Sequence, residues 1–282
     1  MRFSTHLLIV DPQRDFCDLA DDMCPPTVAP ALPIPGADAD LRRLAALLDA
    51  AGHAIDAITI TLDTHQLIDI AHAPFWRRGD GREVPAFTPI TAAEVRSGVY
   101  VPKDPSWTAW VLHYAEALEA AGRYTLMAWP VHCVDGTWGH AMHTILAEAV
   151  TRWESAFGKT VALLRKGMNP KTEHYSIVQA EVPDPDDPTT LPNHQLLEVL
   201  RRADRVVVAG EAGSHCVRAS VEHLVAYVEP ERLVLLQDCM SPVTGFAEEH
   251  AAFLADMAAR GVRVADSQRF MAELAIDRSF AP

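Results

Sequence analysis

The chain has 282 residues, and a formal net charge of -14 without any basic cluster excludes nucleic acid as a partner. No apolar run approaches the roughly 18 residues that a membrane span needs, and the N-terminus lacks a secretory signal pattern. Five cysteines without C-x-x-C spacing argue against a disulfide framework, so we expect a cytoplasmic protein with reduced thiols and one large domain.

The first predicted strand is the apolar, β-branched run Thr5–Val10. Asp11 follows at its end, and Pro12 forces the chain to turn there. A carboxylate at the end of such a strand is well placed for acid–base catalysis, although an aspartate that caps a turn explains the same pattern. The leucine spacing of Leu41–Ala51 then predicts an amphipathic helix, which Gly52 ends.

A second predicted strand, Ala57–Leu62, leads directly into Asp63 and His65, and His72 follows a few residues later. An aspartate and a histidine two residues apart on an extended segment point the same way, which suits chelation of one metal ion. This pair also occurs by chance, and a surface histidine needs no ligand to explain it. His132, in a stiff Trp-Pro turn, strengthens the metal hypothesis, because two histidines and one carboxylate leave coordination positions for water.

The stretch from Pro74 to Tyr124 (74–124) predicts an insertion laid over the active edge of the sheet. Its first part, up to Gly98, is irregular, and Trp107–Ala121 predicts a helix. The aromatic residues of this stretch either line a pocket or merely anchor a long loop. They are Phe75, Trp76, Phe87 and Tyr100.

A short strand is predicted at Tyr124–Ala128, and a helix at Gly139–Trp153. Two histidines on that helix, His140 and His143, are interpreted as packing or surface residues. The next predicted strand, Thr160–Leu164, leads into Lys166.

A lysine at the end of a buried strand is costly unless it pairs with a carboxylate, so Lys166 either meets Asp11 or reaches solvent.

The segment from Thr172 to Pro192 (172–192) predicts an extended loop. Strands and helices alternate over the rest of the chain, which predicts a three-layer αβα fold with a mostly parallel central sheet. These elements are helices at 194–203, 217–227 and 247–260 and strands at 205–209, 233–237 and 262–265.

Cys216 begins a helical pattern directly after an apolar run and a glycine-flanked turn. Unpaired N–H groups and the helix dipole favour a thiolate at this position, and the sulfur would lie at the carboxyl edge of the sheet, where open α/β folds bind ligands. Alternatively, Cys216 is a small apolar residue that packs under a helix and has no catalytic role.

Five short motifs occur in this order, each after a predicted strand, and they span most of the chain. They are Asp11-Pro-Gln-Arg-Asp-Phe16, Asp63-Thr-His65, Trp129-Pro-Val-His132-Cys133, Lys166-Gly167 and Gly213-Ser-His-Cys216. Together they resemble the motifs of the isochorismatase-like cysteine hydrolases, and within them the nicotinamidases. The second and third motifs point to the nicotinamidases, because isochorismatases themselves lack the metal site.

The resemblance implies that Cys216 is the nucleophile, Asp11 the general base and acid, and Lys166 the supporting cation. It implies an oxyanion hole formed by the N–H groups of Ala212 and Cys216, and a cis peptide bond between Glu211 and Ala212. Glu211 stands where nicotinamidases usually carry an apolar residue.

The resemblance also implies a divalent metal ion held by Asp63, His65 and His132, with His72 matching a ligand that only some relatives contribute. Zinc is the expected metal, and iron or manganese also suit these ligands. The ion would bind and polarise the ring nitrogen of the substrate.

Aromatic walls around the substrate ring are implied for Phe16, Trp129 and Tyr175. The expected reaction is the hydrolysis of nicotinamide to nicotinate and ammonia, by a homo-oligomer. Because the insertion and the extended loop lie near the expected site, another small amide, such as a carbamoyl or heteroaromatic carboxamide compound, is the alternative substrate. A catalytically silent relative that only binds a metal or a partner is a further alternative, against which the complete Cys-Asp-Lys set argues.

Overall fold

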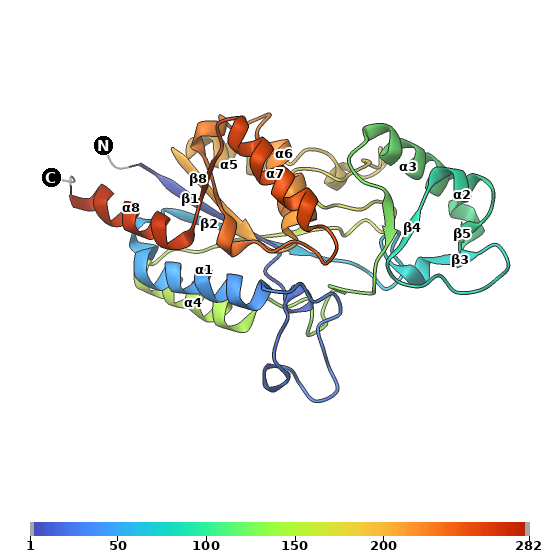
Figure 1. The fold of residues 1–282 in the computed structure, drawn as a ribbon, viewed down its shortest axis with the longest axis horizontal. Coiled ribbons are helices and arrows are strands. Elements are labelled where there is room, and N and C mark those ends of the chain that lie inside the picture. Colours follow the sequence, from blue (N-terminus) through green and yellow to red (C-terminus); the bar gives the residue numbers. More distant parts are fainter. Residues whose placement is uncertain (1–2, 280–282) are drawn as a thin grey trace.

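The structure is a computed structural model, and it describes residues 3–279. A six-stranded sheet in the order β10-β9-β8-β1-β2-β7 forms its centre, and every neighbouring pair of strands is parallel (Figure 1). β1 is buried at all six positions, as expected for a strand covered on both faces. The strands are β1 (Thr5–Val10), β2 (Ala57–Asp63), β7 (Ala162–Lys166), β8 (Arg205–Gly210), β9 (Leu233–Leu236) and β10 (Arg263–Ala265).

Helices cover both faces of this sheet, which confirms the predicted three-layer αβα fold (Figure 1). On one face α1 packs beside α4, and the leucine stripe of α1, including Leu41 and Leu44, is fully buried. On the other face lie α5, α6 and α7, while α8 packs against α1. These helices are α1 (Ala37–Ala51), α4 (Thr144–Phe157), α5 (His194–Arg202), α6 (Arg218–Leu224), α7 (Ala247–Ala259) and α8 (Ser267–Ser279).

The predicted insertion folds, together with the strand that follows it, into a lobe beyond the end of the sheet, which we call the insertion lobe (residues 74–128; Figure 1). The expectation of an irregular first part was wrong, because two antiparallel ribbons, β3-β5 and β4-β6, close around a separate apolar cluster. Phe75, Trp76 and Tyr100 are buried in that cluster and anchor the lobe. The elements are β3 (Trp76–Arg78), β4 (Thr88–Ile90), α2 (Ala92–Arg96), β5 (Tyr100–Pro102), α3 (Thr108–Ala121) and β6 (Leu126–Ala128).

Several boundaries differ from the sequence-based expectation. The helix expected at Gly139–Trp153 begins only at Thr144, because the His143 side chain caps it by accepting the N–H of Leu146. His143 is fully buried, which agrees with a packing role. The extended loop at 172–192 is present, with only a 3-10 turn near its end. Within the described residues, no helix is both long and apolar enough to cross a membrane.

Candidate active site

The carboxyl ends of four adjacent strands bring the candidate catalytic residues together. Asp11 follows β1, and Lys166 ends β7. Asp63 ends β2 directly beside Lys166 in the strand register. β8 leads through a short turn to Cys216. Because parallel strands end at the same edge of a sheet, residues far apart in the sequence meet there.

Lys166 lies at the centre of this group. Its Nζ is 2.8 Å from Asp11 Oδ2 and 3.0 Å from Asp63 Oδ1, and it donates to the Cys216 sulfur over 3.7 Å. Burial opposes the charge of Lys166, but the carboxylates of Asp11 and Asp63 outweigh it and raise the pKa of Lys166 well above its ordinary value. The expected pairing of Lys166 with Asp11 is thus present, and a second carboxylate joins it.

Cys216 lies in a tight turn rather than at the start of an α-helix. Gly213–Val217 forms a single π-helical turn, and α6 follows it. Such turns are rare and occur frequently at functional sites. The chain enters the turn at Gly210, where a Cβ atom would lie 2.0 Å from the backbone oxygen of Val10, so only glycine fits beside β1.

The expected cis peptide bond between Glu211 and Ala212 is wrong, since the described residues contain no cis peptide bond. The chain reverses instead through a left-handed Ala212, with φ of 54°. Hydrogen bonds hold this conformation, because the Ala212 carbonyl accepts from His215 N at 2.8 Å and from Val217 N at 3.3 Å. The left-handed Ala212, between trans peptide bonds, therefore makes the turn that a cis peptide bond was expected to make.

The environment of Cys216 differs from the expectation that a helix terminus favours the thiolate. Burial raises the pKa of the Cys216 thiol well above its ordinary value, and Lys166 opposes that rise. Burial also raises the pKa of Asp11, whose Oδ1 accepts a hydrogen bond of 2.6 Å from the Thr61 hydroxyl. The sulfur and the carboxylate oxygens of Asp11 and Asp63 lie within 4.8 Å of one another. The thiol is therefore protonated at rest, with a carboxylate oxygen of Asp11 within 4.8 Å of its sulfur.

Three histidines form a cluster next to this group. Ring nitrogens of His65, His72 and His132 lie within 4.8 Å of one another. The Nδ1 atom of each faces an oxygen that can only accept, so Nδ1 carries a proton in each ring. The acceptors are Asp69 Oδ2 at 3.0 Å, Gln66 O at 2.9 Å and Pro130 O at 2.8 Å, respectively. Burial opposes the charge of His65, but Asp63 and Asp69 outweigh it and raise the pKa of His65 well above its ordinary value.

Asp63 completes a donor set that suits a divalent cation. Its Oδ2 lies 3.1 Å from His65 Nε2 and 3.8 Å from His132 Nε2, while its Oδ1 faces Lys166. Burial lowers the pKa of His132 to about 4 and that of His72 to about 3, so both rings are neutral. Three imidazole nitrogens and one carboxylate oxygen fit zinc, iron or manganese, provided that the ion displaces the proton on His65 Nε2. His72 contributes through the histidine cluster, in which its ring nitrogen lies within 4.8 Å of those of His65 and His132.

Residues that hold these groups in place were missed in the sequence analysis. The Gln13 amide donates to Asp63 O at 2.8 Å and accepts from Asp63 N at 2.7 Å. Asp15 accepts the N–H of Cys133 at 2.7 Å, which fixes the turn that carries His132. The fully buried Asp69 orients the His65 ring. The only signal for Gln13 and Asp15 was their place in the first motif.

Glu173, in the extended loop, was also missed. It is buried, and a carboxylate oxygen lies within 4.8 Å of the candidate ligand atoms of Asp63 and His65. Burial raises the pKa of Glu173 to about 8. Its backbone N–H donates to the Tyr114 hydroxyl of α3 at 3.2 Å, so the insertion lobe touches this edge of the site.

Aromatic side chains surround the site. Phe16 packs on the His132 ring, with 5.4 Å between ring centroids. The Trp129 indole N–H donates to the Tyr175 hydroxyl at 3.0 Å. His215, which was not predicted, lies 5.3 Å from both the Trp129 ring and the Tyr175 ring. Of the three predicted wall residues, Trp129 and Tyr175 thus contact each other, while Phe16 packs on the histidine cluster.

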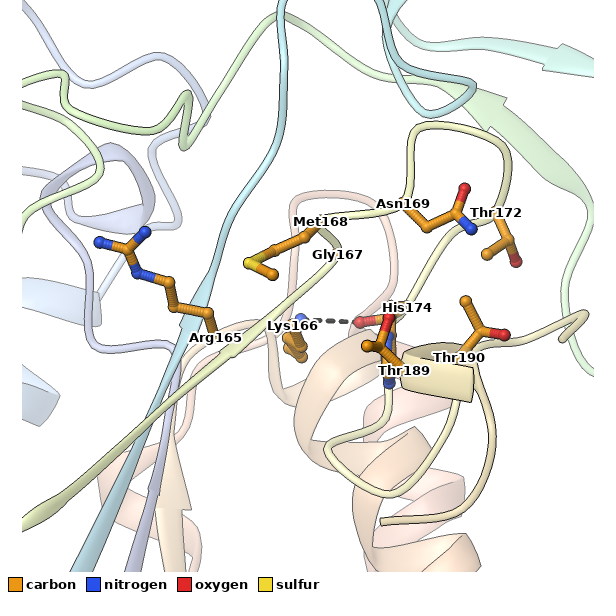
Figure 2. Close-up of a pocket in the computed structure, with 9 residues that line it drawn as sticks. All are labelled: Arg165, Lys166, Gly167, Met168, Asn169, Thr172, His174, Thr189 and Thr190. Atoms are coloured by element: carbon orange, nitrogen blue, oxygen red, sulfur yellow. Dashed lines mark hydrogen bonds between the residues drawn. The ribbon is translucent and has the colours of Figure 1, made fainter. Parts of the chain in front are cut away.

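Two hollows border this group. Figure 2 shows the smaller, of about 30 Å³, in which Lys166 donates to the carbonyl of His174 at 2.8 Å and Arg165 points away. The larger, of about 170 Å³, lies beside the nucleophile turn. It is lined by Arg123, Tyr124, Thr125, Met127, Ser214, His215, Arg218, Phe246 and Glu249.

Glu211 is fully buried, and neither of its carboxyl oxygens has a hydrogen-bond partner among the described residues. Burial raises the pKa of Glu211 well above its ordinary value, and Asp40 and Asp18 raise it further. These two neighbours lie on the α1 side of the turn. The strongest charges that act on the Glu211 carboxyl therefore come from the α1 side of the turn.

The order of the sheet and the helices on both faces give this chain the fold of solved nicotinamidases, pyrazinamidases and an isochorismatase-like hydrolase. The yeast nicotinamidase Pnc1p superimposes with a TM-score of 0.61 and 19% identity over 93% of this chain and 99% of its own. The Acinetobacter baumanii nicotinamidase/pyrazinamidase superimposes with a TM-score of 0.61 and 18% identity over 95% of this chain and 98% of its own. The zinc complex of Pyrococcus horikoshii pyrazinamidase superimposes with a TM-score of 0.54 and 19% identity over 93% of this chain and 99% of its own. No protein-family model and no curated protein sequence matches the chain.

Proposed function

We propose that the protein is a metal-dependent amidohydrolase that uses Cys216, Asp11 and Lys166 to hydrolyse nicotinamide to nicotinate and ammonia. The observation that carries this proposal is the position of Lys166, which contacts both the Asp11 carboxylate and the Cys216 sulfur. The fold shared with nicotinamidases and pyrazinamidases supports an amide substrate.

In the proposed first half-reaction, Asp11 takes the thiol proton and the Cys216 sulfur attacks the amide carbon. The carbonyl electron pair moves to oxygen, and the backbone N–H groups of Ala212 and Cys216 stabilise the oxyanion, by about 3 kcal/mol per donor. The carbonyl then re-forms, the C–N bond breaks, and ammonia leaves with the proton that Asp11 held. Lys166 keeps the acceptor carboxylate in place and offsets the negative charge of the sulfur.

In the second half-reaction, Asp11 takes a proton from water, which attacks the thioester carbon. The C–S bond breaks, the acid is released, and Asp11 returns the proton to the Cys216 sulfur. One carboxylate thus moves the proton in both steps, which suits a group whose pKa is raised by burial.

The residues proposed to hold the metal ion are Asp63, His65, His72 and His132, whose donor atoms converge beside the nucleophile. When bound, the ion would act as a Lewis acid toward the ring nitrogen of the substrate. Zinc is the proposed metal, which is supported by the zinc complex of the pyrazinamidase that shares the fold.

The aromatic residues Phe16, Trp129 and Tyr175 are proposed to hold the substrate ring. A cytoplasmic location is also proposed, and is supported by five cysteines that are all unpaired.

The test is ammonia release from a panel of nicotinamide, pyrazinamide, carbamoyl compounds and aliphatic amides. We expect turnover of the pyridine and pyrazine carboxamides that Cys216→Ala abolishes and Asp11→Asn lowers at least about 100-fold. Cys239→Ala, which also truncates a buried cysteine, is the matched control and keeps activity. Undiminished turnover in Cys216→Ala would overturn the nucleophile assignment, and no ammonia from any amide would favour a silent relative.

A further inference from the structure

Phe87 differs from the other aromatic residues at the start of the insertion lobe. Its side chain is 54% exposed, whereas Phe75, Trp76 and Tyr100 are buried. Its backbone has φ of 61°, a left-handed conformation that residues with bulky side chains rarely adopt. Strain of this kind persists where neighbouring structure enforces it, and it is concentrated at sites of function.

The β4-β6 ribbon holds Phe87 in this position. Thr88 pairs with Ala128, and the Phe87 N–H donates to the Ala128 carbonyl at 2.7 Å. The next residue after Ala128 is Trp129, and the Phe87 ring meets the Trp129 ring edge-to-face, with centroids 6.0 Å apart and an interplanar angle of 85°. The insertion lobe therefore delivers one fixed, exposed aromatic ring to a wall of the candidate site.

The Trp129 ring connects Phe87 to the nucleophile turn. Trp129 is only 3% exposed, and its ring also contacts the His215 ring, one residue before Cys216. Phe87, Trp129 and His215 thus form a row of rings that runs from solvent to the nucleophile turn. Phe87 is the outermost ring of this row, and its side chain is exposed, whereas Trp129 and His215 are buried.

We propose that Phe87 is a substrate-contacting residue at the entrance of the site and selects planar aromatic carboxamides over small aliphatic amides. This inference rests on the proposed amidase function. A flat ring that enters along Trp129 can pack against the Phe87 ring, while an aliphatic amide offers no ring for such a contact. Ring contacts of this type change affinity about 2- to 10-fold.

The experiment measures KM and kcat of Phe87→Ala and Phe87→Tyr for nicotinamide and pyrazinamide, and the inhibition constant of propionamide. We expect Phe87→Ala to raise KM for both aromatic amides about 2- to 10-fold, with kcat within about twofold. Propionamide inhibition should stay unchanged, and Phe87→Tyr should restore the parental KM. Phe157→Ala is a matched control, because Phe157 is 41% exposed and its ring lies 6.0 Å from the buried Trp153.

Two results would overturn the inference while the proposed function stands. One is a parental KM for nicotinamide in Phe87→Ala, and the other is an equal loss of affinity for propionamide, which would indicate a general structural role. Phe87→Gly checks the strain independently, since it should melt at or above the temperature of Phe87→Ala. If the parent hydrolyses no amide at all, the proposed function itself fails, and this inference fails with it.

Discussion

The Lys166 ammonium is shared by two carboxylates from neighbouring strands, Asp11 and Asp63. Asp63 uses its other oxygen toward His65, so one carboxylate connects the lysine to the histidine cluster. The proposed nucleophile site and the proposed metal site are therefore two parts of one buried charge network. Residues that orient its members are as important as the members themselves.

Asp69→Asn should weaken metal binding about 10- to 100-fold, because the Asp69 carboxylate fixes the His65 ring and raises its basicity. Competition for zinc against a chromogenic chelator measures this affinity directly, without an activity assay. Asp135→Asn, at a half-exposed ion pair with Arg165, is the control and should bind zinc as the parent does. Equal affinity in Asp69→Asn would show that Asp69 does not act on the metal site.

Glu211→Gln should make stability less dependent on pH. The unfolded carboxyl ionises near its ordinary value of 4.5, whereas burial keeps the folded carboxyl protonated at higher pH. The folded chain then binds more protons than the unfolded chain, so this group makes stability fall as pH rises above 4.5, by at most about 1.4 kcal/mol per pH unit. Urea unfolding of both proteins between pH 5 and pH 8, spanning about 3 pH units, tests this. Parallel pH profiles would contradict it.

The sequence motifs identified Asp11, Asp63, Lys166 and Cys216 because each follows an apolar run, and parallel strands carry such residues to one edge. Side chains that act through backbone hydrogen bonds, such as Gln13, leave no spacing pattern, so they were missed. The wrong cis bond has a similar cause. Residue types do not reveal whether a turn closes through a cis peptide or through a left-handed alanine.

The insertion lobe stabilises the extended loop from outside the sheet. Tyr114 of α3 is fully buried and accepts the Glu173 N–H, and the Trp110 indole donates to Lys171 O at 2.7 Å. The same loop carries Tyr175, which bonds Trp129. Lobe and loop together thus position one wall of the candidate site.

Tyr114→Phe should lower the free energy of unfolding by about 1–3 kcal/mol, because the buried Glu173 N–H loses its acceptor. It should also raise KM more than it lowers kcat, since the loop that carries Tyr175 loosens. Thermal unfolding and steady-state kinetics measure the two effects. Tyr227→Phe, at an exposed tyrosine, is the control. Unchanged stability in Tyr114→Phe would mean that water replaces the hydroxyl.

Long periodic segments were predicted well, and short ones were not. The first strand was predicted with its observed bounds, and α5, α7 and β8 differ from expectation by a single residue at one end. β3, β4 and α2 are too short to show a period, so the first part of the insertion, up to Gly98, was predicted to be irregular. α8 was missed because its apolar residues do not follow one face.

Lys166→Met should destabilise the entire chain, because it leaves the carboxylates of Asp11 and Asp63 buried without their cation. Breaking a buried pair from one side costs about 3–5 kcal/mol. Denaturant unfolding at neutral pH measures this loss. Lys103→Met, which removes a surface pair with Glu83, should change stability by less than about 1 kcal/mol. Similar losses in both variants would show that the network around Lys166 is not stabilising.

Self-association stays a prediction for the molecule as a whole. Sedimentation velocity gives the mass in solution, against 30.9 kDa for one chain.

The strand order also determines when the site can form during folding. β1 pairs with β8, and Thr5 lies opposite Arg205, so the central pair joins segments about 200 residues apart. Contacts this distant in sequence form slowly, because a long loop must close before they stabilise anything. During synthesis on a ribosome, β1 cannot pair with β8 until β8 has emerged. In refolding experiments we therefore expect helical circular dichroism to return before the Cys216 thiol becomes protected from alkylation, because the burial of Cys216 depends on the last strands to assemble.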